Sequence, residues 1–115
     1  MLRRFTQQFL NLIKEDLKKH PVIIYSTSTC PYCTYAKSTF DELEVKYHDE
    51  VLDRIPEGQQ KAKGLLDMTG MRTVPNIFIH SQHIGGFSEL VKGLQEGTVQ
   101  DILDEAKIPY KLPKS

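Results

Sequence analysis

The chain has 115 residues, of which 39% are hydrophobic and 26% charged, and its fifteen basic and fifteen acidic residues cancel to a formal net charge of zero. This length and composition predict one soluble globular domain that buries its own core without structural staples. The neutral balance gives no reason to expect nucleic acid as a partner. We also expect no membrane partner, because no apolar run reaches the length of a membrane span and no signal-peptide core is present.

The first predicted element is an amphipathic helix over residues 3–19. Its apolar residues recur at helical spacing: Phe5, Phe9, Leu12, Ile13 and Leu17. Residues 1–14 contain basic residues and no acidic one, which also fits an amphipathic transit peptide. Because the pattern continues through Glu15 and Asp16, we interpret the segment as the first helix of the domain and keep the transit peptide as the alternative.

The rest of the chain alternates strands and helices. The predicted strands are 22–25, 46–52, 76–80 and 83–84, and the further helices are 31–44, 59–69, one that Ser88 caps and Gly97 ends, and one that Thr98 caps with Asp101. Ser81-Gln82 joins the last two strands into a hairpin. This order predicts an α/β domain with a mixed four-stranded sheet and helices on both faces. The core spans about residues 20–107, and 108–115 form an extended, flexible tail.

Both cysteines lie in Cys30-Pro31-Tyr32-Cys33, directly after the first strand and at the start of a helix. One helical turn brings the second sulfur beside the first, close enough to bond. The same turn aims free backbone N–H groups at the first sulfur, which favours the thiolate. We therefore predict a thiol–disulfide redox site with Cys30 as the nucleophile and the more shielded Cys33 as the resolving thiol. A single pair at this spacing suits a reducing compartment.

Two histidines suggest an alternative to redox chemistry. His80 and His83, together with the two cysteines, could supply the four ligands of a tetrahedral zinc site. However, the two pairs lie far apart in the sequence, and the histidines flank a hairpin tip that would point away from the active loop. We therefore expect no metal and keep a zinc-binding module as a lesser alternative.

Two further patterns each have a functional and a structural interpretation. A cis Val74–Pro75 bond would leave the N–H and C=O of Val74 free to pair with an extended peptide, whereas an ordinary loop proline fits the spacing equally well. Gly85-Gly86 would let the backbone approach a ligand, and the following helix start could offer N–H groups to a carboxylate. A hairpin exit with a helix cap explains the same glycines.

Three motifs in this order resemble the glutaredoxin family, specifically its dithiol branch. They are Thr29-Cys30-Pro31-Tyr32-Cys33, Thr69-Gly70-Met71-Arg72-Thr73-Val74-Pro75-Asn76 and Ile84-Gly85-Gly86-Phe87-Ser88-Glu89-Leu90. The resemblance implies a thioredoxin-like fold and an enzyme that reduces protein–glutathione mixed disulfides and protein disulfides, with glutathione as co-substrate. We expect a monomeric, cytoplasmic protein, with a mitochondrial location as the alternative. Some members of the family share an iron–sulfur cluster between two subunits, but the stiff loop at Pro31 argues against that function.

The resemblance also assigns roles to residues. Cys30 would form the mixed disulfide with glutathione, Ser88 would hold a carboxylate of the tripeptide, and Glu89 would hold its ammonium group. The residues expected to border glutathione are Thr27, Tyr32, Arg72, Thr73, Val74, Pro75, Gly86, Phe87, Ser88 and Glu89.

The sequence departs from the family pattern at three positions. Thr27 stands where members usually carry lysine, so a cation near the first cysteine is missing and more depends on the helix terminus and Arg72. Glu89 replaces the commoner aspartate. The position that often holds glutamine falls near Ala62, where Lys61 or Lys63 would substitute.

Overall fold

The structure is a computed structural model that describes the backbone of residues 2–112 and the side chains of residues 7–112. One four-stranded sheet has the order β2-β1-β3-β4, in which β1 pairs in parallel with β2 and antiparallel with β3, and β3 pairs antiparallel with β4. The expected mixed sheet is confirmed. The elements are α1 Leu2–Lys19, β1 Val22–Ser26, α2 Pro31–Glu42, β2 His48–Val51, the 3-10 turn η1 Leu52–Arg54, α3 Gly58–Thr69, β3 Asn76–Ile79, β4 Gln82–Gly85, α4 Phe87–Glu96 and α5 Thr98–Glu105.

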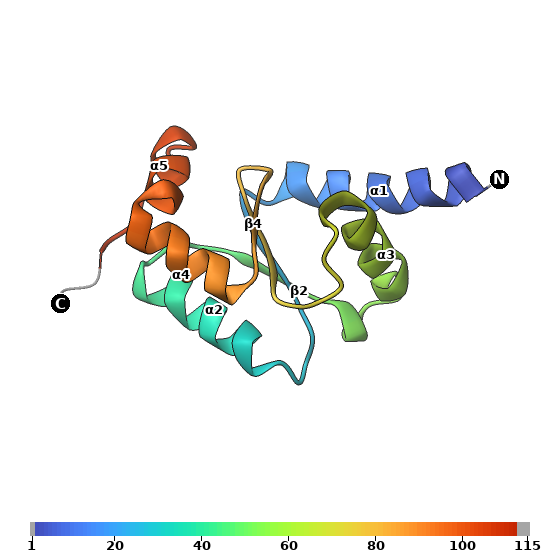
Figure 1. Cartoon of the computed structure of the whole chain (residues 1–115), viewed down its shortest axis with the longest axis horizontal. Helices are drawn as coiled ribbons and strands as arrows, with labels where there is room; N and C mark the ends of the chain where they lie inside the picture. Colours follow the sequence, from blue (N-terminus) through green and yellow to red (C-terminus); the bar gives the residue numbers. More distant parts are fainter. Residues whose placement is uncertain (1, 113–115) are drawn as a thin grey trace.

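Helices cover both faces of the sheet, with α1 and α3 on one side and α2, α4 and α5 on the other (Figure 1). Successive side chains of a strand point to opposite faces. Ile24 of β1 therefore joins the core beneath α2, α4 and α5, and Ile23 joins the core beneath α1 and α3. Complete burial of such a side chain contributes about 1.5–3 kcal/mol, so the alternation in β1 stabilises both layers.

Helix α1 packs against α3, which supports its interpretation as the first helix of the domain. Ile13 is completely buried, and a side chain on Gly64 would bring its Cβ within 2.6 Å of the Phe9 carbonyl oxygen. The two helix backbones thus approach closely because α3 carries a glycine at the contact. The expected core position at Phe5 lies outside the side chains that the structure describes. Within residues 2–112, α1 and the other helices are all too short or too polar to cross a bilayer.

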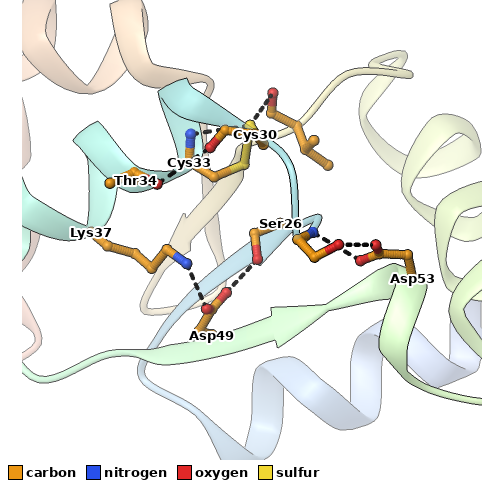
Figure 2. Close-up of a disulfide and its surroundings, with 9 residues drawn as sticks. Ser26, Cys30, Cys33, Thr34, Lys37, Asp49 and Asp53 are labelled. Atoms are coloured by element: carbon orange, nitrogen blue, oxygen red, sulfur yellow. Dashed lines mark hydrogen bonds and ion pairs between the residues drawn. A yellow bond between two sulfur atoms is a disulfide. The ribbon is translucent and has the colours of Figure 1, made fainter.

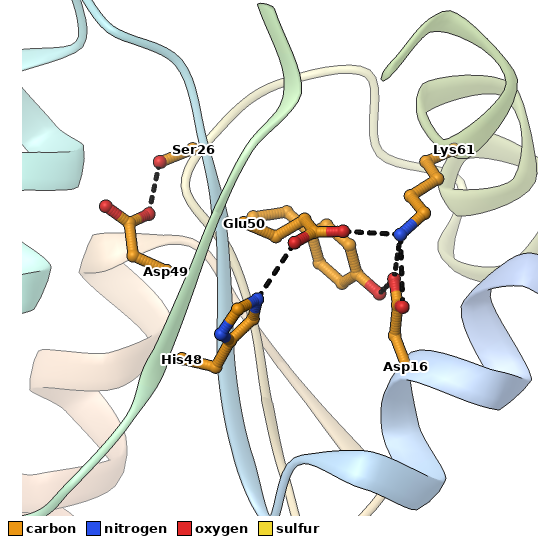
Figure 3. A network of polar contacts seen from close by, with 7 residues as sticks. Asp16, Ser26, His48, Asp49, Glu50 and Lys61 are labelled. Atoms are coloured by element: carbon orange, nitrogen blue, oxygen red, sulfur yellow. Dashed lines mark hydrogen bonds and ion pairs between the residues drawn. The ribbon is translucent and has the colours of Figure 1, made fainter. Parts of the chain in front are cut away.

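A buried ionic network ties α1 to the sheet and to α3 (Figure 3). The Lys61 ammonium donates to Asp16 at 3.0 Å and also to Glu50, and the Tyr25 hydroxyl donates to Asp16 at 2.9 Å. Burial opposes ionisation of Glu50, but hydrogen bonds from Lys61 and His48 outweigh it, so the pKa of Glu50 is lowered. Burial likewise opposes the charge on Lys61, and the hydrogen bonds to Asp16 and Glu50 raise its pKa. These shifts keep Glu50 and Lys61 charged inside the fold.

Three expected helix ends are wrong. Helix α2 stops at Glu42, and Glu44 has a left-handed backbone with φ 57° that a continuing helix excludes. Gly86, not Ser88, is the N-cap of α4, because the Glu89 side chain reaches back to the Gly86 N–H. At α5, Thr98 donates its hydroxyl to the Gly93 carbonyl oxygen at 3.2 Å instead of capping the helix.

The hairpin turn and the C-terminal segment also differ from expectation. The turn is centred on His80 and Ser81, both with positive φ, one residue earlier than expected. The first residues of the expected flexible tail pack on the domain, because Ile108 and Tyr110 contact the apolar core and the Lys111 N–H donates to the Leu43 carbonyl oxygen at 2.8 Å. Residues 113–115 lie outside the described residues.

The ionic network predicts a large effect of Lys61→Met. The variant leaves the carboxylates of Asp16 and Glu50 buried together without a cation, so the free energy of unfolding at pH 7 should fall by about 3 kcal/mol in urea titrations. Because the pKa of Glu50 is lowered in the fold, its stabilising contribution is present above its unfolded pKa and is lost as the pH falls. The difference in free energy of unfolding between Lys61→Met and the unmodified protein should therefore become smaller below about pH 4.

Lys92→Met provides the control for loss of a lysine, because Lys92 is exposed on α4. It should change the free energy of unfolding by less than about 0.5 kcal/mol. An equally small change for Lys61→Met at pH 7 would contradict the structural role assigned to the network.

Candidate active site

The two cysteines form a disulfide at the start of α2 (Figure 2). Their Cα atoms are 5.2 Å apart, within the usual range for a disulfide. Cys30 is the N-cap of α2, and its sulfur accepts a hydrogen bond from the Cys33 N–H at 3.1 Å. Pro31 occupies the first position of the helix, where a missing N–H costs nothing. The prediction of a redox-active pair at a strand–helix junction is thus met by the geometry.

The two sulfurs differ in accessibility. Cys33 is only 1% exposed and belongs to the buried face of α2, whereas Cys30 is half-buried at the open end of the helix. An incoming disulfide can therefore meet Cys30 more readily than Cys33. The prediction that Cys30 is the nucleophile and Cys33 the resolving thiol depends on such an asymmetry.

The loop before Cys30 is anchored by Asp53 of η1 (Figure 2). The Ser28 hydroxyl and the Ser28 N–H, the latter at 2.9 Å, both donate to the Asp53 carboxylate. These two hydrogen bonds lower the pKa of Asp53, so the carboxylate stays ionised at neutral pH. Asp53 thus fixes the chain two residues ahead of the reactive sulfur.

A second polar group lies beneath α2. Lys37 forms an ion pair with Asp49 of β2 at 2.8 Å, and the Ser26 hydroxyl also donates to Asp49 (Figure 2). Lys37 follows Cys33 by one helical turn, and Ser26 ends β1. The contacts therefore hold the first two turns of α2 against the end of β1 and the edge strand β2.

An open groove of about 670 Å³ lies beside the disulfide, and we call it the thiol groove. The predicted site residues that line it are Tyr32, Thr73, Val74, Pro75, Gly86, Phe87, Ser88 and Glu89. The Val74–Pro75 bond is cis, one of the two possibilities that the sequence left open. The Val74 carbonyl oxygen lies 3.6 Å from the Cys30 sulfur. The fold thus brings three separate sequence motifs together around one sulfur.

Glu89 organises the far wall of the thiol groove. Its carboxylate accepts the Gly86 N–H at 2.7 Å and the Ser88 hydroxyl at 2.8 Å, and these two hydrogen bonds lower its pKa. Gly85 has a left-handed φ of 117°, and a Cβ there would lie 2.9 Å from the Glu89 side chain. Gly85 is therefore favoured both by its backbone conformation and by the close approach of Glu89.

The remaining predicted residues, Thr27 and Arg72, line a second groove that meets the first at Val74. We call it the α3 groove, and Phe9 of α1 and Lys63 of α3 also line it. Lys61 or Lys63 was expected as a substitute cation here, and Lys61 does not face the groove, because it is 5% exposed and bound to carboxylates inside the fold. Lys63 is the lysine that faces the groove.

The histidines of the zinc alternative have other contacts. The His83 ring bonds the Asn76 side chain at 2.7 Å and packs on Phe78 at 5.1 Å between ring centroids, and the turn residue His80 is exposed. Within residues 7–112, no three His, Cys, Asp or Glu side chains gather closely enough to hold a metal ion. The cysteines are instead bonded to each other.

Sequence reasoning missed Asp53 and Met71. Met71 lines the thiol groove, and its position beside Arg72 in the second motif was a usable signal. Asp53 accepts a hydrogen bond from Ser28, which lies 25 residues earlier in the sequence, and no local pattern predicts such a contact.

A Cys-x-x-Cys disulfide at the start of a helix, shortly after a strand and with an open groove beside the accessible cysteine, is typical of a thiol–disulfide oxidoreductase. The glutaredoxin family model matches residues 22–84. Rice Glutaredoxin-C8 is 40% identical over 96 residues, which cover 82% of this chain and 71% of the relative. The chain belongs to the glutaredoxin family. It is a glutathione-dependent thiol–disulfide oxidoreductase, and glutathione is its co-substrate.

Other comparisons support the fold and broaden the set of relatives. The buckwheat glutaredoxin–glutathione complex superposes with a TM-score of 0.86 at 30% identity and covers 92% of this chain and 96% of that chain, which confirms the thioredoxin-like fold. Mouse mitochondrial Glutaredoxin-2 is 33% identical over 102 residues, covering 89% of this chain and 65% of the relative. Castor bean glutaredoxin is 38% identical over 93 residues, covering 81% of this chain and 91% of the relative.

The anchoring of Ser28 predicts that Asp53→Ala slows catalysis. Loss of both hydrogen bonds should loosen the loop that positions Cys30 and reduce kcat/KM for a glutathione mixed disulfide by about threefold to tenfold. Asp53→Asn, which keeps an acceptor oxygen, should lose less, and Asp67→Ala on the exposed face of α3 should match the unmodified protein. Turnover is followed as NADPH oxidation coupled to glutathione reductase. If Asp53→Ala turned over at the unmodified rate, the anchoring role would be wrong.

Proposed function

We propose that Cys30 takes the glutathionyl group from glutathionylated proteins and that Cys33 closes the disulfide when the substrate is a protein disulfide. The accessible position of Cys30 at the N-cap of α2, with the Cys33 N–H directed at its sulfur, is the observation that carries this proposal. A first-turn N–H and the positive helix end both stabilise a thiolate, which is the attacking form.

The deglutathionylation cycle needs only one protein thiolate. Cys30 attacks the glutathionyl sulfur, a new Cys30–glutathione disulfide forms, and the substrate cysteine leaves as a thiolate that takes a proton from water. A second glutathione thiolate then attacks the glutathionyl sulfur on Cys30, which releases oxidised glutathione and restores the Cys30 thiolate. Potentials of glutaredoxins lie at about −200 to −230 mV, close to the glutathione pool, so the exchange is reversible.

Protein disulfides take a second path through Cys33. After Cys30 has attacked and one substrate thiol has left, the Cys33 thiolate attacks the Cys30 sulfur of the mixed disulfide and releases the second substrate thiol. The product is the Cys30–Cys33 disulfide seen in the structure. Two glutathione molecules reduce it and leave as oxidised glutathione.

The thiol groove is the proposed glutathione site. The Val74 backbone would pair with the cysteinyl part of the tripeptide, and Ser88 and Glu89 would hold its γ-glutamyl end. Two facts support this placement: eight residues assigned by family resemblance line one groove, and a similar structure is a glutaredoxin–glutathione complex. At the other end, Arg72 and Lys63 of the α3 groove would supply the positive charge that Thr27 lacks.

We further propose that the protein acts as a monomer on glutathionylated and disulfide-containing proteins in the cytoplasm. The mitochondrion is the second candidate compartment, since the mouse relative is a mitochondrial protein and the N-terminal segment is amphipathic. No observation favours the cluster-binding alternative, and Pro31 at the first position of α2 restricts the loop rearrangement that it would require.

The mechanism predicts different consequences for the two cysteines. Cys30→Ser should abolish turnover of every substrate, because no other thiol is accessible at the helix start. Cys33→Ser should retain turnover of a glutathionylated protein and lose reduction of a protein disulfide. Both reactions are measured by NADPH oxidation with glutathione and its reductase, and circular dichroism confirms the fold of each variant. Equal loss in both variants would refute the assignment.

The proposed role of Arg72 predicts a weaker substrate complex in Arg72→Met. Removing a charge-assisted contact to a glutathione carboxylate should raise KM for a glutathione mixed disulfide about fivefold and leave kcat nearly unchanged. Arg54→Met is the matched control, because Arg54 is an exposed residue of η1 outside both grooves. A KM unchanged by Arg72→Met, or raised equally by Arg54→Met, would contradict this role.

A further inference from the structure

Three aromatic rings, two exposed and one half-buried, form a cluster beside the disulfide, which we call the aromatic platform. Tyr32 and Tyr35 of α2 lie 5.8 Å apart between ring centroids, and Phe87 of α4 lies 6.0 Å from Tyr32 and 5.8 Å from Tyr35. Tyr32 is 60% exposed and Tyr35 is 52% exposed. Among the described side chains, Leu112 is the one other large hydrophobic residue with comparable exposure. Contiguous apolar surface of this kind marks an interaction site more often than scattered exposed residues do.

The platform overlaps the thiol groove and extends beyond it along α2. Tyr32 and Phe87 line both surfaces, whereas Tyr35 lies outside the groove, one helical turn further along α2. A mixed disulfide has two halves that meet at the reacting sulfur. If glutathione fills the thiol groove, the protein half must leave Cys30 over the neighbouring surface, and the platform extends that surface along α2.

The surroundings favour an apolar group on the platform over a charged one. The charged side chains nearest to it along α2 and α4 are already engaged, because Lys37 pairs with Asp49 and Glu89 accepts the Gly86 N–H and the Ser88 hydroxyl. A charged side chain arriving there would lose water without gaining an unpaired opposite charge. Three tilted rings instead offer a large apolar contact at little cost in side-chain entropy.

We propose that the aromatic platform of Tyr32, Tyr35 and Phe87 docks an apolar side chain next to the modified cysteine of the protein substrate. This inference rests on the proposed function and adds a preference among protein substrates. Tyr35 distinguishes the role of the platform from that of the thiol groove, because it belongs to the platform and does not line the groove.

The test uses glutathionylated peptides that differ only in the residue flanking the cysteine, which is leucine, serine or arginine. The unmodified protein should turn over the leucine peptide with a kcat/KM about fivefold above the serine peptide, through a lower KM. Tyr35→Ala should remove this preference, Tyr35→Phe should keep it, and Leu112→Ala should leave it unchanged. The mixed disulfide of 2-mercaptoethanol and glutathione should be turned over equally by all four proteins.

Other results would overturn the proposed platform. Equal turnover of the three peptides by the unmodified protein, or a preference for arginine through cation–π contact, would overturn the apolar platform while small-substrate activity leaves the proposed function intact. Failure on every substrate would overturn the proposed function and the platform together. Sedimentation that shows a dimer of the unmodified protein but not of Tyr35→Ala would assign the platform to self-association and overturn the proposal.

Discussion

The hydrogen bond from the Cys33 N–H to the Cys30 sulfur joins the fold to the chemistry. Helices usually begin with a serine, threonine, aspartate or asparagine oxygen as the acceptor for a first-turn N–H. In α2 a sulfur takes that place, so the atom that starts the helix is also the atom that reacts. The loop anchored by Asp53 and the ion pair beneath α2 matter because they hold this one atom where both the helix and the thiol groove need it.

Local signals in the sequence identified the strand–helix junction and the three motifs around it. A strand, a Cys-x-x-Cys pair and a helix with proline at its first position follow one another within a few residues, so no knowledge of the fold was required. The cap of α4 was harder to predict. Ser88 is the better capping residue by type, but the Glu89 side chain accepts the Gly86 N–H, and the helix begins two residues earlier than a Ser88 cap would allow.

Local sequence patterns do not predict contacts between distant segments, but they do predict which face of α3 each lysine lies on. Whether Lys61 or Lys63 faces the groove follows from helical spacing, because Lys61 precedes Leu65 by four residues and shares its buried face. A buried lysine is unfavourable unless its charge is paired, and here Asp16 and Glu50 pair with the Lys61 ammonium. Both partners come from other elements, and Glu50 lies on an edge strand whose polar side chains gave only a weak strand pattern.

Helix α1 precedes the region matched by the family model but is part of the folded domain. The family match starts at residue 22, within β1, yet Phe9 of α1 forms part of the wall of the α3 groove and its carbonyl oxygen is packed against Gly64. A chain shortened to residue 22 would therefore lose the part of the α3 groove wall that Phe9 forms opposite Arg72 and Lys63. It would also lose Ile13 and so expose the core side chains that Ile13 contacts. The segment before the family-model match thus forms part of the wall of a groove that meets the thiol groove at Val74, so the shape of that surface depends on α1 as well as on the family motifs.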